Sequence, residues 1–404
     1  MRESPLRNGH RSRAAALLAL ALLSGCNVTP DLNFAPPIVC RTRTDVVSSI
    51  YLIGDAGEPK LPEPTEQDRL VDPVLSHLRA AVDESVAVVG PDRTLVVYLG
   101  DNVYPAGLPP KDQEGREHAE RILEAQIAAA GRARAIFVLG NHDWNQAKEN
   151  GYERALAQYE YLSTRAPNVE MRPPNACPGP DAIDFGDDLR LVFGDLWSAI
   201  YHEKFPDAGL HKACDFPYEA TGLPARYRFR DEMRSTSRRS ILLIHAPLIT
   251  SGPHGGYFPW REHIFPLRVF HRDLWIPLPI IGSIFPLVRL MGVTDTDLTS
   301  RNYRNYHEAM DDIFEPNRPV LVASGHEHSL QIHVDPLGTF HAVSGAGSTR
   351  KVDYVRTLRS ELMAVAAPGY MRMDEYQDGT LHLTVTAPSK ASRPDGLIFH
   401  TCIL

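Results

Sequence analysis

The pentapeptide Gly-Asp-Asn-Val-Tyr at positions 100–104 follows the apolar, β-branched run Leu95–Leu99. Such a run predicts a fully buried strand, and a glycine directly after it lets the backbone turn sharply at the strand's carboxyl end. Asp101 and Tyr104 then lie in the loop where open α/β sheets place their ligands. A carboxylate there can bridge two hard cations, and a nearby phenolate suits a ferric ion. The stretch therefore predicts a metal-binding loop at the end of a buried strand.

Other predicted strands end on metal-ligand residue types as well. Each of these residues, considered alone, could have a structural role instead of binding a metal. Asp55 could form a turn, and Asn141 could adopt a left-handed backbone conformation. Together they form a set of carboxylates, an amide, a phenol and imidazoles that cannot stay unpaired in a dry core. They can surround two metal ions that share one carboxylate and one water. The predicted ligands are Asp55, Asp101, Tyr104, Asn141, His245, His326 and His328.

The order of predicted elements indicates the fold class. Helices are expected over 66–82, 115–130, 151–164 and 301–314. Strands are expected over 49–53, 94–99, 135–139, 189–193, 240–244, 319–324, 331–334, 339–343, 370–374 and 381–385. The pattern alternates strand and helix first and is rich in strands later, which predicts an α/β protein of two packed sheets with helices outside.

Composition excludes some classes of function. The chain has 404 residues, of which 43% are hydrophobic and 23% charged, which is typical of a soluble globular protein. Its net charge of −8 provides no basic field for nucleic acid.

The first 45 residues are predicted to lie outside the fold. Arginines precede the apolar run Ala14–Leu23, which is typical of a secretory signal over residues 1–25. Leu23-Ser24-Gly25-Cys26 resembles the bacterial lipobox, which implies that a lipidated Cys26 anchors the chain to a membrane. The alternative is a plain signal peptide with Cys26 incidental. Residues 26–45 are expected to be a tether and 46–404 the folded domain.

The remaining cysteines, Cys40, Cys177, Cys214 and Cys402, are even in number, as expected of an exported protein with disulfides. Four cysteines allow three pairings. We favour Cys40–Cys402, which joins the termini, and Cys177–Cys214, which closes a loop.

Residues 256–300 form the least ordinary segment. Their apolar run, Leu274–Val288, contains Pro277, Pro279 and Pro286, which argues against a membrane span. The alternatives are an insertion packed on its own domain, a proline-stiffened lid and a membrane-facing loop.

The motifs at the strand ends resemble those of the calcineurin-like metallophosphoesterases: GD-x-G at 54–57, GD-x-x-Y at 100–104, GNHD at 140–143, His245 after a strand, and GH-x-H at 325–328. That family's fold is a four-layer α/β/β/α sandwich of two mixed β-sheets flanked by helices. The wider family usually has Asp-x-His in its first motif. Here Gly57 replaces the histidine, and Tyr104 would supply the missing ligand, as in purple acid phosphatases.

GDNVYPAG at 100–107, GHEHSLQ at 325–331 and VSGAGS at 343–348 resemble the tartrate-resistant type of purple acid phosphatase, over residues 46–350 without the 256–300 segment. The resemblance implies an Fe(III) site of Asp55, Tyr104 and His328, bridged by Asp101. A divalent ion (Fe, Zn or Mn) would be held by Asn141, His245, His326 and Asp101. Metal-bound hydroxide would attack the phosphate ester, and charge transfer from Tyr104 to iron would colour the protein.

The resemblance also implies catalytic residues. His142 would hydrogen-bond the phosphate or protonate the leaving group, with Asp143 orienting a neighbour. His254 lies where the tartrate-resistant enzymes have a second catalytic histidine, although Pro253 stands where they have an acidic residue. Glu327 replaces an aspartate that is not a ligand.

The function expected from this resemblance is a phosphomonoesterase, an exported bacterial lipoprotein that faces the periplasm or the cell exterior. Two alternatives remain: a phosphodiesterase acting on nucleotides or phospholipid head groups, and a non-catalytic envelope lipoprotein that binds a partner. The sequence leaves the natural substrate, the divalent metal and the oligomeric state open.

Overall fold

The computed structural model describes residues 33–34, 37–39, 45–63, 69–206, 214, 223–234, 237–269, 274–278, 281–314, 318–348, 352–356, 358, 360–392 and 395–403. The predicted signal, its Cys26 and most of the predicted tether lie outside these ranges. The described part of the tether does not lie outside the fold as expected, because Asn33 and Phe34 pair with Ala364 and Met363 and the Cys402 amide donates to the Ile38 carbonyl at 2.9 Å. Within them, no helix has both the length and the apolar character needed to cross a membrane.

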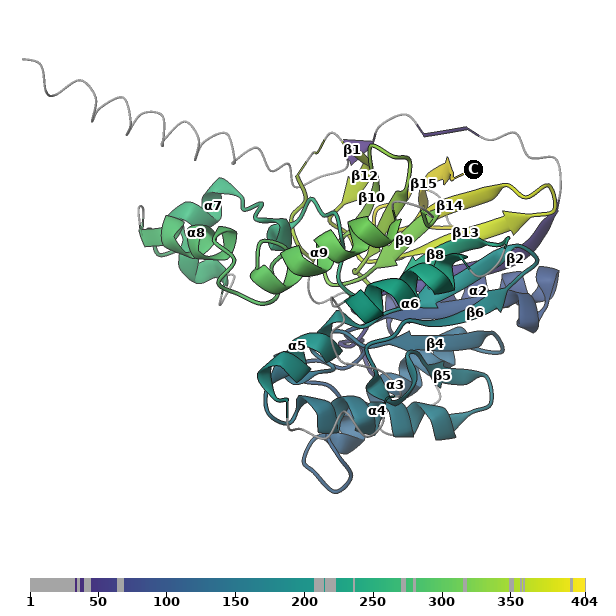
Figure 1. The fold of residues 1–404 in the computed structure, drawn as a ribbon, viewed down its shortest axis with the longest axis horizontal. Helices are drawn as coiled ribbons and strands as arrows, with labels where there is room; N and C mark the ends of the chain where they lie inside the picture. Colours follow the sequence, from purple (N-terminus) through teal and green to yellow (C-terminus); the bar gives the residue numbers. More distant parts are fainter. Residues whose placement is uncertain are drawn as a thin grey trace, which may run out of the picture.

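Two mixed sheets form the centre of the fold (Figure 1). One has seven strands in the order β15 (Leu397–Cys402), β14 (Leu381–Thr386), β13 (Tyr370–Tyr376), β2 (Val46–Ile53), β3 (Thr94–Leu99), β4 (Arg134–Val138) and β5 (Val169–Met171). The other has eight in the order β1 (Asn33–Phe34), β12 (Glu361–Val365), β10 (Leu330–Val334), β11 (Phe340–Ser344), β9 (Leu321–Ser324), β8 (Arg239–Leu243), β7 (Leu189–Phe193) and β6 (Asp181–Phe185). The predicted α/β class with two packed sheets is confirmed.

Side chains alternate between two apolar cores, as the period of a strand requires. In β3, Leu95, Val97 and Leu99 belong to the core between the sheets, which also contains Leu191 and Leu243 of the facing sheet. The intervening residues Val96 and Tyr98 belong to the core under the helices. Both faces of these strands are therefore buried, which explains their continuous apolar sequence.

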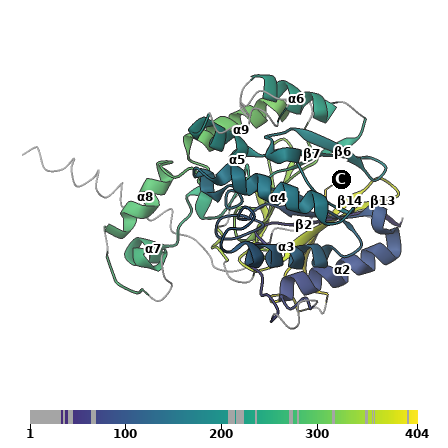
Figure 2. The ribbon, with the colours of Figure 1, turned by 90° about the horizontal axis from the view of Figure 1, so that it is seen from below.

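Helices cover the outer faces of both sheets (Figure 2). The seven-stranded sheet is covered by α2 (Pro73–Val89), α3 (Arg116–Ala130) and α4 (Gly151–Arg165). The eight-stranded sheet is covered by α6 (Leu223–Arg234) and α9 (Arg301–Phe314), while α5 (Leu196–Lys204) contacts α4. The four layers expected from the sequence motifs are present.

The bounds predicted for the first helix were wrong. We expected residues 66–82, but α2 starts at Pro73 and continues to Val89. The Asp72 carboxylate caps it by accepting hydrogen bonds from the amides of Val74 (3.0 Å) and Leu75 (3.1 Å), and Gly90, with φ 86°, ends it. An aspartate followed by proline is the stronger start signal, because proline fits the first turn of a helix.

The 256–300 segment does not lie flat on the domain. It contains α7 (Trp260–Ile264), the 3-10 turns Pro266–Val269 and Ile281–Ser283, and α8 (Ile284–Leu290). These pack on one another, and Figure 1 shows α7 and α8 standing out from the body of the molecule beyond α9. Arg289 of α8 joins this part of the segment to the domain, because its guanidinium binds the Asp297 carboxylate.

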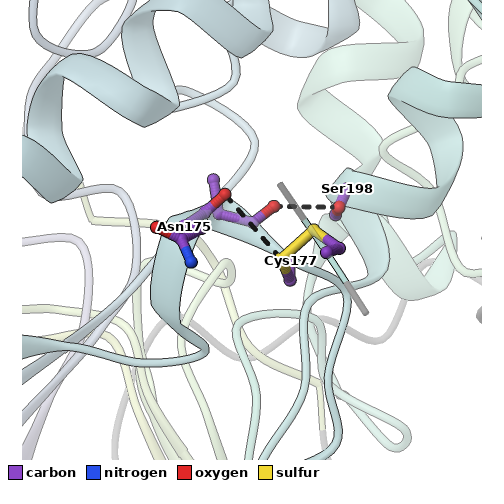
Figure 3. The surroundings of a disulfide bond; sticks show 5 residues. Asn175, Cys177 and Ser198 are labelled. Carbon is purple, nitrogen blue, oxygen red and sulfur yellow. Dashed lines mark hydrogen bonds between the residues drawn. A yellow bond between two sulfur atoms is a disulfide. The ribbon is translucent and has the colours of Figure 1, made fainter. Parts of the chain in front are cut away.

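The predicted Cys177–Cys214 disulfide is confirmed, with 5.8 Å between the Cα atoms. Figure 3 shows its surroundings: the Cys177 sulfur lies 3.9 Å from the Asn175 carbonyl oxygen, and the Ser198 hydroxyl donates to the Ala176 carbonyl at 3.1 Å. Cys402 is also disulfide-bonded, but its predicted partner Cys40 lies outside the described residues.

We expect the double variant Cys177→Ser/Cys214→Ser to lose about 2–4 kcal/mol of unfolding free energy, because the bond constrains the unfolded chain over a separation of 37 residues. Guanidinium unfolding measures this loss. Ser198→Ala, which removes only the neighbouring hydrogen bond, should cost about 1 kcal/mol. An unchanged midpoint in the double variant would contradict the disulfide.

Candidate metal centre

Parallel strands of both sheets end at one edge, and the seven predicted ligands meet there. Strands β2, β3 and β4 are parallel neighbours in one sheet, as are β8 and β9 in the other. Hydrogen bonds join the two edges, from the Gly54 amide to the Ser344 carbonyl (2.7 Å) and from His245 Nδ1 to the Leu99 carbonyl (2.8 Å). Six of the ligands are at most 5% exposed, namely Asp55, Asp101, Asn141, His245, His326 and His328. Tyr104 is partly buried.

The backbone at this edge is unusual. Asp55, Asp101 and His326 have φ values of 57°, 53° and 70°, in the left-handed region that costs energy for residues other than glycine. The adjacent glycines are required because a Cβ at Gly100 would lie 2.5 Å from His245 Nδ1, and one at Gly140 would lie 2.3 Å from Asp101 Oδ1. Glycine thus lets the backbone approach the ligands directly.

The first ligand group joins Asp101, His245 and His326, with the Asn141 amide oxygen 2.9 Å from both imidazoles. His245 Nδ1 faces a carbonyl and therefore carries a proton, which leaves a lone pair on Nε2. His326 Nε2 faces the Thr296 carbonyl at 2.8 Å, so its lone pair is on Nδ1. These two lone-pair nitrogens are 3.2 Å apart. Such a convergence of acceptors is unfavourable unless a cation lies among them.

The second ligand group joins Asp55, Asp101 and His328. The Tyr104 hydroxyl lies at its centre, 2.8 Å from Asp55 Oδ1, 3.1 Å from Asp101 Oδ2 and 3.0 Å from His328 Nε2. The other ring nitrogen of His328, Nδ1, faces the Asp353 carboxylate at 3.2 Å, which favours the proton on that side. The Tyr104 hydroxyl thus lies within hydrogen-bond distance of two carboxylate oxygens and one imidazole nitrogen.

Electrostatics in the second group also favours positive charge. Burial alone would lower the pKa of His328, but the carboxylates of Asp353 and Asp55 raise it to about 10. Asp101 belongs to both groups, as a bridging ligand must. The donor atoms are oxygens of carboxylates, an amide and a phenol, together with nitrogens of imidazoles. Such a set fits two metal ions that share Asp101.

Gly57 has no room for the histidine found at its position in the wider family. A Cβ there would lie 2.6 Å from the Asp101 carbonyl oxygen and 2.6 Å from the Val103 amide. The two loops instead pack backbone to backbone, and the Tyr104 amide donates to the Gly57 carbonyl at 3.0 Å. The same contact that excludes a histidine therefore brings Tyr104 to the ligands.

His142 lies at the site, as predicted. Its backbone amide donates to Asp101 Oδ1 at 2.8 Å, and Nδ1 lies 2.6 Å from the Pro105 carbonyl oxygen. Nε2 is 4.0 Å from Asp101 Oδ2, and the side chain is 20% exposed. Asp143 has the orienting role expected of it, because its carboxylate accepts hydrogen bonds from the amides of Asn102 and Gly140.

His254 also lies at the site, and its carboxylate partner was missed in the sequence. Its ring is 4.2 Å from that of His326, and its Nδ1 is 3.2 Å from Asp297 Oδ1. Asp297 belongs to the 256–300 segment and also binds Arg289. Although burial alone would raise the pKa of Asp297, His254 and Arg289 lower it. The carboxylate that contacts His254 thus comes from Asp297, which is distant in sequence, and not from position 253, where this chain has a proline. No sequence motif indicates Asp297.

Glu327 has a role that the sequence did not indicate. Its carboxyl group is fully buried and accepts a hydrogen bond from the His254 amide at 2.7 Å. Burial raises its pKa to about 8. A Cβ at Gly252 would lie 2.2 Å from Glu327 Oε2, so glycine is needed for this approach. Glu327 therefore holds the loop that carries His254.

The model of the calcineurin-like phosphoesterase family matches residues 49–330, more than half of the chain. The protein belongs to that family, whose members are phosphoesterases. No curated protein sequence matches the chain.

The solved structures that are similar to it include the following two. One is GAP50, described as the anchor in the inner membrane complex of Plasmodium, at 14% identity, with 89% of each chain covered and a TM-score of 0.49. The other is the purple acid phosphatase PPD1 from yellow lupin (Lupinus luteus) seeds, at 11% identity and a TM-score of 0.47. This match covers 89% of the present chain and 54% of the lupin chain. At these TM-scores neither structure carries an argument about activity.

We expect Asp101→Ala to bind neither metal ion tightly, because it removes a ligand from both groups. His245→Ala should retain the ion held by the Asp55 group. Elemental analysis of each purified variant measures the metal content, with the exposed Asp187→Ala as the control. Two metals per chain in Asp101→Ala would show that Asp101 is not the shared ligand.

Proposed function

We propose that this chain is a purple-acid-phosphatase-like phosphomonoesterase with Fe(III) in the Asp55–Tyr104–His328 group and a divalent ion (Fe, Zn or Mn) in the Asn141–His245–His326 group. The observation that supports it best is the pair of ligand groups that share Asp101, with a tyrosine hydroxyl in only one of them. A phenol oxygen among carboxylates suits a hard trivalent ion.

Tyr104 requires a bound cation to act as a phenolate. Burial and the carboxylates of Asp101 and Asp55 raise the pKa of its hydroxyl well above the usual value. Only a strongly charged ion at this position would displace the proton. When bound, the two ions would lower the pKa of a water and offset the charge of the phosphate group.

The chain's own residues would bind and orient the ester. His142 is held through its Nδ1 by the Pro105 carbonyl, so Nε2 is directed toward the site. In its imidazolium form the ring can donate a hydrogen bond from Nε2 to a phosphate oxygen or a proton to the leaving alcohol. His254, fixed by Asp297 and Glu327, would contact the ester from the side of His326. These contacts would align the ester for in-line displacement.

The proposed setting is the envelope of a bacterium. The predicted signal and lipidated Cys26 would place the domain in the periplasm or at the cell exterior.

A second candidate function, a phosphodiesterase acting on phospholipid head groups, is supported by the exposed apolar residues of α8 near the site. The third, a non-catalytic binding lipoprotein, would not need the full ligand set.

We expect the protein purified without chelator to contain two metals, at least one of them iron, and to show a broad visible band that Tyr104→Phe abolishes. Tyr376→Phe, which changes a tyrosine far from the ligands, should keep the band. Iron without a band in the wild type would remove Tyr104 as a ferric ligand.

Hydrolysis of mono-p-nitrophenyl phosphate compared with bis-p-nitrophenyl phosphate separates the two esterase activities. No hydrolysis of either substrate with Fe, Zn or Mn would favour the binding role.

We expect Asp297→Asn to lower kcat by about tenfold or more, because residues that orient a functional histidine commonly contribute that much. The matched control is Asp295→Asn on the same loop, where the carboxylate pairs with Lys204 at the surface and accepts a hydrogen bond from Asn302 at 3.4 Å. Since Asp297 orients rather than binds a metal, the metal content should stay at the wild-type value. Equal rates for the two variants would contradict this role.

A further inference from the structure

Exposed apolar side chains are concentrated on one part of the surface. Among the described residues, fourteen large hydrophobic side chains are exposed, and nine of them lie within residues 259–293, which we call the α7–α8 projection. The nine are between 39% and 69% exposed: Trp260, Leu274, Trp275, Ile276, Ile284, Leu287, Leu290, Met291 and Val293. Figures 1 and 2 both show α7 and α8 extending away from the sheets.

Helix α8 presents its apolar face to the outside. Ile284, Leu287 and the capping residue Met291, whose backbone is still helical, are spaced by three and four residues, so they lie on one side of α8, and all three are exposed. Arg289 instead faces the domain, where its guanidinium binds the Asp297 carboxylate and lies over the Phe258 ring. A surface helix normally has the reverse arrangement. The exposed face is therefore suited to an apolar environment.

The two accessible tryptophans of the chain are both on this projection. Trp260 and Trp275 are 50% and 52% exposed, whereas Trp144 and Trp197 are at most 1% exposed. Half-exposed indole rings beside aliphatic side chains are typical of proteins that lie at the boundary between lipid head groups and acyl chains.

The charge of the projection complements an anionic surface. Apart from Arg289, which binds Asp297, residues 260–293 contain three arginines and two acidic residues, a net charge of +1 in a chain whose total is −8. Anionic lipid attracts such a local positive charge. A second copy of the chain that bound through the same face would instead bring its own positively charged projection to the contact, and the like charges would oppose association. Charge thus favours a lipid surface as the occupant.

We propose that the α7–α8 projection docks on an anionic lipid bilayer, with Trp260, Trp275 and the outer face of α8 inserted at the level of the head groups. The 256–300 segment, which carries the projection, also reaches the metal centre, since the Thr296 carbonyl contacts His326 and Asp297 contacts His254. Docking would thus bring the candidate site close to the bilayer. The proposal does not depend on hydrolysis, and a catalytically inactive protein would dock equally well.

Tryptophan fluorescence tests the proposal in the full chain. Vesicles of phosphatidylethanolamine and phosphatidylglycerol with brominated acyl chains should quench Trp260 and Trp275 but not the buried Trp144 and Trp197. Quenching should disappear in Trp260→Phe/Trp275→Phe. The readout is local to the projection, so binding of vesicles by the N-terminal apolar run does not produce it.

The variant Ile284→Ser/Leu287→Ser should need at least about tenfold more lipid for half-maximal quenching, since each large apolar side chain contributes roughly that factor on burial. Val88→Ser/Leu337→Ser, which changes two exposed apolar residues elsewhere, should match the wild type. Vesicle binding without quenching of Trp260 and Trp275 would overturn the proposal. So would a dimer in sedimentation velocity that only Ile284→Ser/Leu287→Ser dissociates, because the projection would then be an interface between copies.

Discussion

The structure depends on a convergence of hydrogen-bond acceptors on Asp101. The lone pairs of His245, His326 and the Asn141 amide approach it from one side, and Asp55, Tyr104 and His328 from the other, with too few protons to satisfy them. Buried acceptors that face one another are costly unless positive charge lies between them. The surrounding fold holds them in place, with both sheets ending at the same edge and each imidazole fixed by a partner on its other nitrogen.

Close backbone packing makes this convergence possible. Asp55, Asp101 and His326 adopt left-handed backbone conformations, and glycines stand where any Cβ would collide with a ligand or its loop. The cost of these conformations is offset by the two apolar cores that hold the strands. Gly57 shows how a ligand set can change: its loop approaches the Tyr104 loop so closely that a side chain is excluded and a phenol occupies the space.

The 256–300 segment links the metal centre to the surface of the molecule. Its inner part provides Asp297 to His254 and the Thr296 carbonyl to His326. Its outer part exposes apolar side chains around α7 and α8. Arg289 connects the two parts, because it belongs to α8 and binds Asp297. A single segment thus both completes the site and forms the least polar surface of the described structure.

The sequence by itself determined the two-sheet class, most strands of the core and the seven candidate metal ligands that converge at the site. It did so because buried parallel strands have continuous apolar runs, and the residues that follow them must gather at one edge. The start of α2, the Asp297 partner of His254 and the role of Glu327 were decided by the tertiary structure. Asp297 is 43 residues from His254 in the chain, and contacts over such distances leave no local pattern. The outward apolar face of α8 likewise became visible only in three dimensions, since its residues alone do not show which side the domain covers.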